Sequence, residues 1–573
     1  MQPRLNLAYA LLSILIVCFC TTTNAQVRRS TADLVLTNGT IHTLNPDRPK
    51  AQAVAIIGNQ IAVVGTNDEV MPFVGPDTRV IDLKNQAVYP GFKESHGHLM
   101  GIGTAKLQVN LVGVSGYKEL IERIVTRAQN AKPGEWITGR GWHEEKWTDR
   151  SSLTVRGFMT HDDLTKAVPN NPVWVRRADG HAAFANAKAM EVAGVDRNTA
   201  SPEGGAIIMD ADGNPTGVFI DRAMRLIKSP PLTESQRRQA LELGIEECLA
   251  NGITMFDDAG VNVGTIDLYK EYADQGKLNL RLYAMAGGLK TMRTLGQPII
   301  DYGNGFLNVR AVKLVADGAL GSRGAALLEE YEDDPGNSGF FTTPPETVYT
   351  ASQYALQNGW QVATHAIGDR ANRMMLDMYE KAMKEFPHVK DHRFRDEHTQ
   401  ILDEADIKRF AKLGIIASMQ GIHATSDLSW APNRLGVHRT EEGGYVWQKL
   451  LKEGVKIING TDAPVEAVDP IASYYASVTR QKENGTPVGG MYGDQRMTRH
   501  EALRSYTLDA AYGSFHENQG GSIEVGKLAD FTILTKDIMT VPEQEILESE
   551  VMYTIVDGIV RYEKGKPMKP AIP

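Results

Sequence analysis

Short apolar runs typical of buried strands alternate with helical runs over the centre of this chain. Helix-then-strand pairs recur at residues 240–251 and 254–256, 348–358 and 361–364, 403–413 and 415–418, and 449–453 and 455–458. Strands that alternate with helices form a parallel sheet, since each helix returns the chain to the same end of the sheet. The number of units suits a closed barrel better than an open sheet, so we predict an α/β fold built on a distorted (β/α)8 barrel.

The two ends of the chain have the pattern of β-structure instead. Short β-rich runs separated by glycine-containing turns fill residues 32–88, and further strand-like runs occupy residues 526–534 and 551–558. We expect both ends to close one β-sandwich, made from residues 26–89 and 521–573. The barrel domain then spans residues 90–520.

One long segment, residues 103–232, fits the alternation of strands and helices poorly. It is rich in tryptophan, glycine and asparagine. We interpret it as an insertion after the first barrel strand. Loops that follow barrel strands line the active sites of such folds, so this insertion is expected to shape a pocket.

The first residues have the layout of a secretory signal peptide. Arg4 precedes an apolar run from Leu5 to Cys20, and Ala25 offers a small residue before a cut. We therefore expect residues 1–25 to be removed and the protein to be exported, either periplasmic or secreted. The apolar run is shorter than the about 20 residues that a spanning helix needs, so we expect no membrane span in the mature chain.

Charge and cysteine content narrow the classes of partner and site. The chain has 61 Lys and Arg against 70 Asp and Glu, a net charge of -9, which does not favour a nucleic-acid partner. After removal of the signal segment Cys248 is the one remaining cysteine, so neither an intrachain disulfide nor a cysteine-based metal site is expected. The sandwich and the insertion both offer faces for a homodimer, which the sequence neither requires nor excludes.

A His-x-His pair follows the last β-rich run of the amino-terminal part. His96 and His98 stand at alternate positions of the expected first barrel strand, so their side chains project to the same side. Two exposed loop histidines, or a hydrogen-bonded pair in the core, would have the same sequence pattern. A metal ion would satisfy one nitrogen of each ring, and further ligands downstream would favour that interpretation.

Single polar residues lie within or directly after four later apolar runs. They are Lys313, His365, His398 and Asp462. Taken singly, each has an ordinary structural explanation, such as a hydrogen-bonded core residue or a helix cap. Because barrel active sites are built at the carboxyl ends of the strands, the shared placement of the four favours one common site.

In this arrangement the chain resembles the metal-dependent amidohydrolase superfamily, and more specifically its YtcJ-like branch, amidohydrolase family 3. The resemblance covers essentially the whole mature chain. It rests on Pro90-Gly91-Phe92 before the histidines, Ala316-Asp317-Gly318-Ala319-Leu320-Gly321-Ser322-Arg323, His365-Ala366-Ile367-Gly368-Asp369, Glu397-His398, Thr461-Asp462-Ala463-Pro464 and Gly526-Lys527-Leu528-Ala529-Asp530.

The resemblance implies a distorted TIM-type barrel and a metal ligand set made of His96, His98, Lys313, His365, His398 and Asp462. It further implies that Lys313 is carboxylated, which would allow it to bridge two cations. Imidazoles and carboxylates without thiolates suit Zn²⁺ but also accommodate Mn²⁺, Fe²⁺ or Ni²⁺, so we expect one or two divalent ions, with Zn²⁺ favoured. Asp462 is then expected to act as the catalytic proton carrier.

Further residues are candidates for shaping the pocket. His181 lies in a segment that resembles one whose histidine faces the reacting group, where it would stabilise an oxyanion, although a core turn explains it equally well. Trp142, Trp147, Arg323, Gln420 and His423 are candidate substrate contacts, with core packing the simpler explanation for the tryptophans. Asp317 and Asp369 are candidates for orienting ligands or for capping loops.

We therefore predict an exported metal-dependent hydrolase of a small-molecule C–N bond other than a peptide bond, such as an N-acyl amine or N-substituted formamide. A deaminase with one metal ion, or a lactone or ester hydrolase, is compatible with the same residues. A non-catalytic extracytoplasmic binding protein on a retired barrel is the rival from another class. The complete set of six candidate ligands speaks against that rival.

Overall fold

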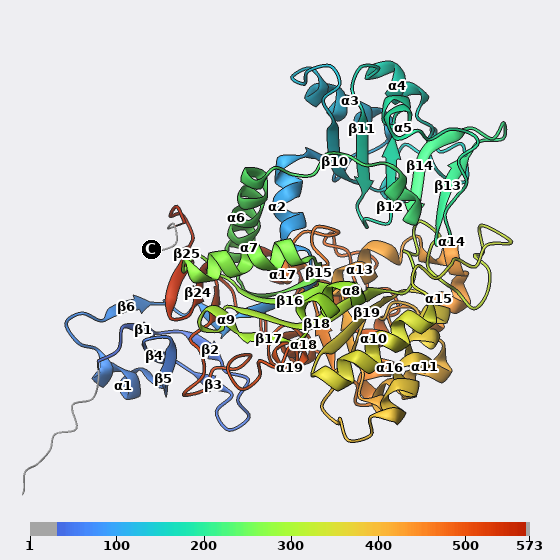
Figure 1. Cartoon of the computed structure of the whole chain (residues 1–573). Coiled ribbons are helices and arrows are strands. Elements are labelled where there is room, and N and C mark those ends of the chain that lie inside the picture. Colours follow the sequence, from blue (N-terminus) through green and yellow to red (C-terminus); the bar gives the residue numbers. More distant parts are fainter. Residues whose placement is uncertain (1–30, 569–573) are drawn as a thin grey trace, which may run out of the picture.

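The computed structural model describes residues 31–568, and its centre is a parallel barrel (Figure 1). Eight strands are hydrogen-bonded side by side in the order β22-β21-β20-β19-β18-β16-β15-β8, and each neighbouring pair is parallel. Their bounds are β8 (Phe92–Gly97), β15 (Ile253–Val261), β16 (Arg281–Gly287), β18 (Leu307–Val315), β19 (Gln361–Ala366), β20 (Arg395–His398), β21 (Ile416–Met419) and β22 (Ile457–Asn459). The predicted α/β barrel is confirmed.

The barrel is closed at its carboxyl end by the chain that follows β22. The backbone N–H of Asp462 donates to the carbonyl of His96 at 2.8 Å, and the N–H of His98 donates to the carbonyl of Ala463 at 2.7 Å. Glu94 adds side-chain contacts, since its carboxylate accepts from the N–H of Thr461 at 2.7 Å and from its hydroxyl at 2.9 Å. The first and last strands therefore meet where the predicted ligands lie.

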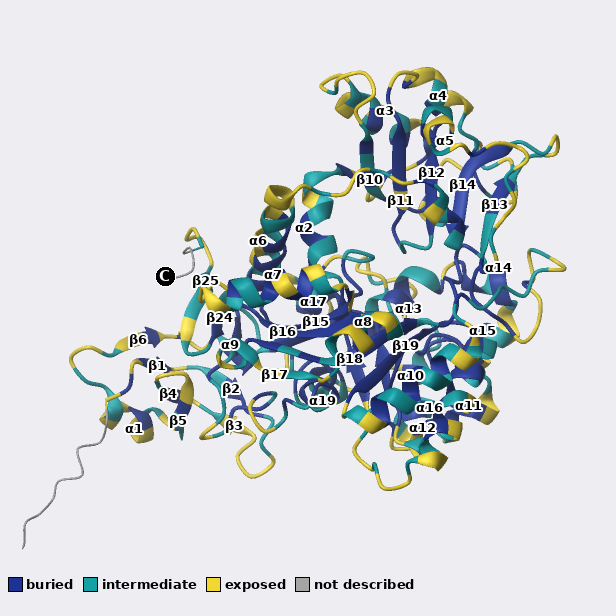
Figure 2. Ribbon diagram, viewed as in Figure 1, coloured by how far each residue is buried: buried dark blue, intermediate teal, exposed yellow. Residues whose placement is uncertain are grey.

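Helices surround the barrel and cover the outer face of its strands, while side chains of the strands themselves fill the interior, so the strands are buried on both faces (Figure 2). α6 begins at a capping box formed by Thr233 and Gln236. The short strand β17 (Ile299–Asp301) pairs antiparallel with β18. The main helices are α2 (Leu99–Leu107), α6 (Glu234–Ala250), α7 (Val263–Asp274), α8 (Gly288–Leu295), α10 (Pro345–Asn358), α11 (Asp369–Glu385), α12 (Glu404–Leu413), α13 (Gly421–Asp427), α14 (Ala431–Leu435), α15 (Val437–Gly443), α16 (Trp447–Lys452), α17 (Pro470–Thr479), α18 (Arg499–Ser505) and α19 (Leu508–Gly513).

The segment between the first two barrel strands forms a separate lobe above the barrel mouth (Figure 1). Its six-stranded sheet has the order β13-β14-β12-β11-β10-β9 and encloses its own apolar cores. Because this sheet packs its own interior, the insertion can present polar side chains to the barrel below it. Its elements are β9 (Val109–Asn110), α3 (Tyr117–Ala128), β10 (Ile137–Trp142), α4 (Asp162–Ala167), β11 (Val173–Arg177), β12 (Ala182–Ala185), α5 (Ala187–Ala193), β13 (Gly205–Met209) and β14 (Pro215–Asp221).

Both ends of the described chain contribute to a pair of β-sheets that share one apolar core. One sheet has the order β5-β4-β1-β6, and the other has the order β25-β24-β23-β7-β2-β3, in which β7 and β23 join the two ends in antiparallel register. The predicted sandwich is thus present. The strands are β1 (Leu34–Thr37), β2 (Thr40–His42), β3 (Lys50–Ala51), β4 (Ala53–Ile57), β5 (Gln60–Gly65), β6 (Arg79–Asp82), β7 (Ala87–Pro90), β23 (Phe531–Leu534), β24 (Val551–Val556) and β25 (Ile559–Glu563).

The two ends are also tied together by the carboxylate of Asp537. It contacts His42 Nε2 at 2.9 Å and accepts from the Tyr89 hydroxyl at 2.9 Å and from the N–H of Met539 at 3.0 Å. Burial alone would raise the pKa of Asp537, but the contacts with His42 and the other donors hold it well below its ordinary value.

Replacing Asp537 by asparagine is therefore expected to lower the free energy of unfolding at pH 7 by about 2 kcal/mol, the usual range for hydrogen bonds to a charged group. A carboxyl group with a depressed pKa stabilises the fold above its unfolded pKa of about 4 and loses that effect as the pH falls. The difference between Asp537→Asn and the parent, measured by urea unfolding, should shrink below pH 4. Asp47→Asn, at an exposed position, serves as the control and should change little.

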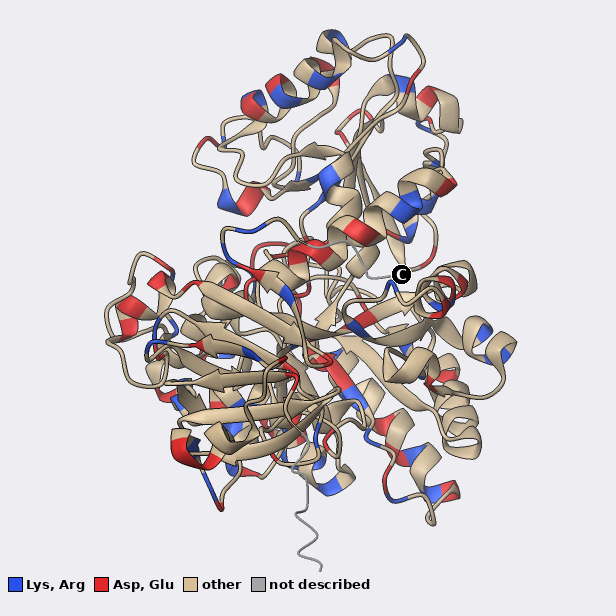
Figure 3. Ribbon diagram, turned by 90° about the vertical axis from the view of Figure 1, so that its left-hand side faces the viewer, with Lys and Arg blue, Asp and Glu red and all other residues tan. Residues whose placement is uncertain are grey.

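Charged side chains are distributed over both the barrel and the insertion (Figure 3). Within residues 31–568, no helix combines the length and the apolar character required to cross a bilayer. The predicted signal peptide, residues 1–25, lies outside the described residues.

Candidate metal centre at the barrel mouth

The structure brings all six predicted ligand residues to one end of the barrel. Each lies at or just beyond the carboxyl end of a barrel strand: His96 on β8, His98 directly after β8, Lys313 on β18, His365 on β19, His398 on β20 and Asp462 after β22. Parallel strands place their carboxyl ends on one rim, which is why residues far apart in sequence meet there.

The closest contacts involve the His-x-His pair. Asp462 Oδ1 lies 3.1 Å from His98 Nε2 and 3.7 Å from His96 Nε2. These three side chains can offer ligand atoms that all lie within 4.8 Å of one another. Lys313 Nζ lies 2.9 Å from His96 Nε2. The four groups therefore converge within coordination reach of a shared point.

The rings of the remaining two histidines pack against this group at tilted or edge-on angles. The ring centroids of His96 and His398 are 4.7 Å apart, and those of His398 and His365 are 4.5 Å apart. His398 Nδ1 contacts Gln420 Oε1 at 2.8 Å, and His96 Nδ1 contacts the carboxylate of Glu397. Since the Nδ1 atoms are occupied in this way, the Nε2 atoms are the ones left to bind a metal ion.

The protonation states suit a cation site. Burial lowers the pKa of His96 to about 4, and it lowers the pKa of His365 and of His398 well below the ordinary value, so these imidazoles are neutral near pH 7. Burial raises the pKa of Asp462, but the hydrogen bond and charge of the neighbouring histidines outweigh it and keep this group a carboxylate.

Two buried atoms of the cluster, His365 Nε2 and Asp462 Oδ1, make no hydrogen bond of good geometry among the described residues, although Asp317 Oδ1 lies 3.4 Å from the first and His98 Nε2 lies 3.1 Å from the second. A buried polar atom without a good hydrogen bond is costly, and a cation held by His96, His98 and Asp462 would compensate the buried carboxylate. Nitrogen and oxygen donors without sulfur fit Zn²⁺ and related divalent ions. The residues present therefore fit the expected metal ion.

A buried charged network supports the cluster from inside the barrel, and the sequence did not predict it. Arg395 Nε donates to Glu397 at 2.6 Å, and its other nitrogens donate to Asp257 at 2.7 Å and to the carbonyl of Ser95 at 2.6 Å. Arg395 and Glu397 stand two residues apart on β20, and this spacing of opposite charges within a buried strand was the signal available in the sequence.

His181 approaches the cluster from the insertion. Its ring centroid lies 4.9 Å from that of His365, and its Nδ1 lies 2.6 Å from Asp221 Oδ1. Burial would lower the pKa of His181, but the Asp221 carboxylate raises it to about 9, so the ring is a cation at neutral pH. Asp221 lies 40 residues further along the chain, and no sequence pattern pointed to it.

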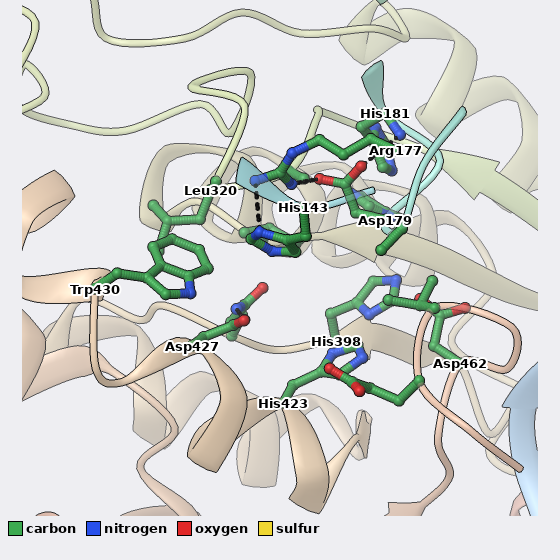
Figure 4. Close-up of a pocket in the computed structure, with 18 residues that line it drawn as sticks. His143, Arg177, Asp179, His181, Leu320, His398, His423, Asp427, Trp430 and Asp462 are labelled. Atoms are coloured by element: carbon green, nitrogen blue, oxygen red, sulfur yellow. Dashed lines mark hydrogen bonds and ion pairs between the residues drawn. The ribbon is translucent and has the colours of Figure 1, made fainter. Parts of the chain in front are cut away.

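Two cavities meet at this site. A narrow one of about 50 Å³ lies between the insertion and the barrel loops (Figure 4). Its lining includes His181, His365, His398, His423 and Asp462. A wider, open cleft of about 780 Å³ is lined by residues that include His98, His181 and Lys313. The candidate ligands thus lie along the boundary between a small enclosed space and a large open one.

The predicted substrate contacts lie at different distances from the two cavities. His423 lines the narrow cavity and stacks on His398. Gln420 acts through His398, as described above, and does not line either cavity. Trp142 and Arg323 line neither cavity: Trp142 is fully buried in the insertion's core, where its Nε1 donates to the carbonyl of Val175, and Arg323 donates to the carboxylate of Asp333.

The remaining candidates have structural partners. Trp147 also packs in the core of the insertion. Asp317 lies 3.4 Å from His365 Nε2 and accepts three backbone N–H groups, so it both orients a ligand and caps loops. Asp369 accepts from the N–H of Leu328 at 2.8 Å and caps a loop.

A nearly closed parallel barrel with a largely buried cluster of histidines and a carboxylate at its carboxyl end is the arrangement of a metal-dependent barrel hydrolase, and comparisons with known proteins agree. The profile of the amidohydrolase family matches residues 79–562. The chain therefore belongs to the amidohydrolase family, in the YtcJ-like branch, amidohydrolase family 3.

Several relatives align over most of their length. The chain is 35% identical to Protein LONG AFTER FAR-RED 3 of Arabidopsis thaliana, over 92% of this chain and 91% of the relative. It is 28% identical to the N-substituted formamide deformylase of Arthrobacter pascens, over 93% and 98%. The crystal structure of a metal-dependent hydrolase from Pyrococcus horikoshii is similar, with a TM-score of 0.71 and 27% identity, over 89% of this chain and 99% of that chain.

Proposed function

We propose that this chain is an exported hydrolase of a small amide-type C–N bond, such as that of an N-acyl amine or an N-substituted formamide. The observation that carries the proposal is the convergence of His96, His98 and Asp462, whose ligand atoms lie within 4.8 Å of one another, beside a cavity of about 50 Å³. The name of the Arthrobacter pascens relative supports the choice of bond. Export rests on the signal-like residues 1–25.

The metal ion, in this proposal one or two Zn²⁺, would be held by His96, His98, Lys313, His365, His398 and Asp462. When bound, it supplies a Lewis acid that polarises a carbonyl group and lowers the pKa of water. Burial lowers the pKa of Lys313 to about 8, so part of the amine is uncharged near neutral pH. The uncharged amine is the form that reacts with CO₂, which supports the proposed carboxylation of Lys313.

The chain's own residues account for the proton movements. In the proposed reaction Asp462 accepts a proton from the attacking water and delivers it to the leaving nitrogen. The water oxygen bonds to the carbonyl carbon as the C–N bond breaks, which yields an acid and an amine. His181, held as a cation by Asp221, donates a hydrogen bond to the developing oxyanion.

Replacement of Lys313 by methionine separates this proposal from deamination at one metal ion. We expect kcat/KM for amides to fall by at least about 100-fold, because one charged ligand and any bridge are removed. The bound metal per chain, measured by mass spectrometry, should fall in parallel. Lys106→Met, at an exposed position that pairs with Glu247, is the matched control. Unchanged amide turnover with one bound metal would contradict the bridging role of Lys313, whereas release of ammonia from a heterocyclic amine that survives the substitution would favour the deaminase.

The deciding experiment combines metal analysis of the purified protein with a panel of amides, esters and lactones. Turnover of an amide by the metal-loaded protein supports the proposal. Faster turnover of an ester or a lactone than of any amide would identify the protein as an ester or lactone hydrolase instead. Absence of both bound metal and turnover favours the extracytoplasmic binding protein. Amino-terminal sequencing of exported material tests the signal peptide.

A further inference from the structure

The wide cleft joins the candidate metal centre to a group of positively charged side chains. At one end it is lined by His98, His181 and Lys313. Four further basic residues line the same cleft, and all of them come from the insertion: Arg176, Arg222, Arg225 and Lys228. We call these four residues the cleft cations. They place positive charge within the space that a substrate at the metal centre would extend into.

The cleft cations have no carboxylate partner within residues 31–568; Arg222 is half-buried and the other three are exposed. Arg177, next in sequence to Arg176, is paired with both Glu144 and Asp179. Among the described residues that line the cleft, Asp221 is the one acidic side chain, and it is bonded to His181.

This local excess of positive charge runs against the composition of the chain, which has a net charge of -9. Like charges gathered along a concave surface repel one another, and the concave surface focuses their field. An anionic group in the cleft would relieve that repulsion. Arginine is also well suited to bind a carboxylate through paired hydrogen bonds.

The narrow cavity on the other side of the centre restricts the opposite half of the substrate. Its volume of about 50 Å³ leaves room for only a few atoms. The buried atoms Trp430 Nε1 and His423 Nε2 belong to residues that line it, and neither has a hydrogen-bond partner among the described residues. The narrow side therefore suits a small polar group, such as a formyl or carboxamide group.

We propose that the substrate carries an anionic group, such as a carboxylate, on the half that lies in the wide cleft, and that its other half is small. This inference rests on the proposed amide hydrolysis and adds the substrate class. The anion has two chemical sources: the amine half, as in an N-formyl amino acid, or the acyl half, as in the monoamide of a dicarboxylic acid. In either case water adds to the carbonyl carbon, the C–N bond breaks, and the nitrogen takes up a proton.

Matched substrates test this proposal on the metal-loaded full chain. N-formylglycine is compared with N-formylglycinamide by release of formate, and succinamate is compared with succinamide by release of ammonia. We expect the anionic member of at least one pair to have a kcat/KM at least 10-fold higher, mainly through a lower KM. The pair that shows the difference identifies the half that carries the charge.

Substitutions locate the effect. The double variant Arg222→Gln and Arg225→Gln should reduce the anionic preference at least 5-fold, and 0.5 M NaCl should reduce it in the parent protein. Arg197→Gln is the matched control, because Arg197 is an exposed residue of the same insertion that bonds Asn214 outside the cleft. It should leave the preference unchanged.

The outcomes separate the two proposals. Equal turnover of charged and neutral members, with no effect of the double variant, overturns the anionic substrate and leaves amide hydrolysis standing. If no substrate is turned over, calorimetry with succinate and succinamide decides. Tighter binding of succinate that is lost in the double variant supports the anion site and overturns hydrolysis, whereas equal binding overturns the anion site as well.

Discussion

Asp462→Asn is expected to lower kcat/KM for the best amide substrate by at least about 10³-fold, within the range that a positioned proton carrier contributes. The substitution keeps the shape of the side chain but removes its negative charge. Asp462 Oδ1, 3.1 Å from His98 Nε2, would lose both its affinity for a cation and its ability to accept a proton. Steady-state kinetics and metal content, measured on the same preparation, check both effects.

The control for this substitution lies nearby in sequence. Asp469 caps α17 by accepting from the N–H groups of Ile471 and Ala472, and asparagine can make the same contacts. Asp469→Asn should change kcat/KM by less than about 2-fold. If Asp462→Asn kept full metal content and more than about a tenth of the activity, neither role assigned to Asp462 could be maintained.

The positions of the six cluster residues could be predicted because barrel topology fixes them. A polar residue at the carboxyl end of a buried parallel strand lies on the barrel rim that the carboxyl ends of all the strands share. His365 and His398 lie far apart in sequence, yet their ring centroids are 4.5 Å apart for this reason. The sequence pattern was sufficient to predict that these residues meet, because neighbouring parallel strands bring their carboxyl ends close together in space.

The insertion shows where this reasoning stops. Trp142 and His181 lie in the same segment, but Trp142 packs in the core of the insertion and His181 reaches the barrel. The insertion folds as a separate sheet with its own interior, so no rule tells which of its residues face the barrel. Asp221, which holds His181, and the cleft cations became evident only from the structure.

Glu397 illustrates a second limit, since its role depends on three strands at once. It contacts His96 from β8, pairs with Arg395 on its own strand, and through Arg395 is connected to Asp257 on β15. Burial would raise the pKa of Glu397, but Arg395 and His96 hold it well below its ordinary value. Its charge therefore both orients a ligand and compensates a buried guanidinium.

Glu397→Gln is accordingly expected to damage stability and metal binding together. Removing one charge of a buried ion pair commonly costs about 3 to 5 kcal/mol, because the partner is left uncompensated, and Arg395 is fully buried. Loss of the group that orients His96 should weaken metal affinity by about 10- to 100-fold. Urea unfolding of the metal-free protein gives the first quantity, and competition with a chelator gives the second.

The matched control is Glu380→Gln, since Glu380 pairs with Arg409 and Lys412 on the outer face of the helices rather than inside the barrel. Exposed pairs of this kind contribute less than about 1 kcal/mol, and metal affinity should not change. If Glu397→Gln lowered stability without weakening metal binding, Glu397 would serve the buried arginine alone. If it weakened metal binding without a loss of stability, Asp257 alone would have to compensate the charge of Arg395. The role of Glu397 would then be to position His96 for metal binding and not to stabilise the fold.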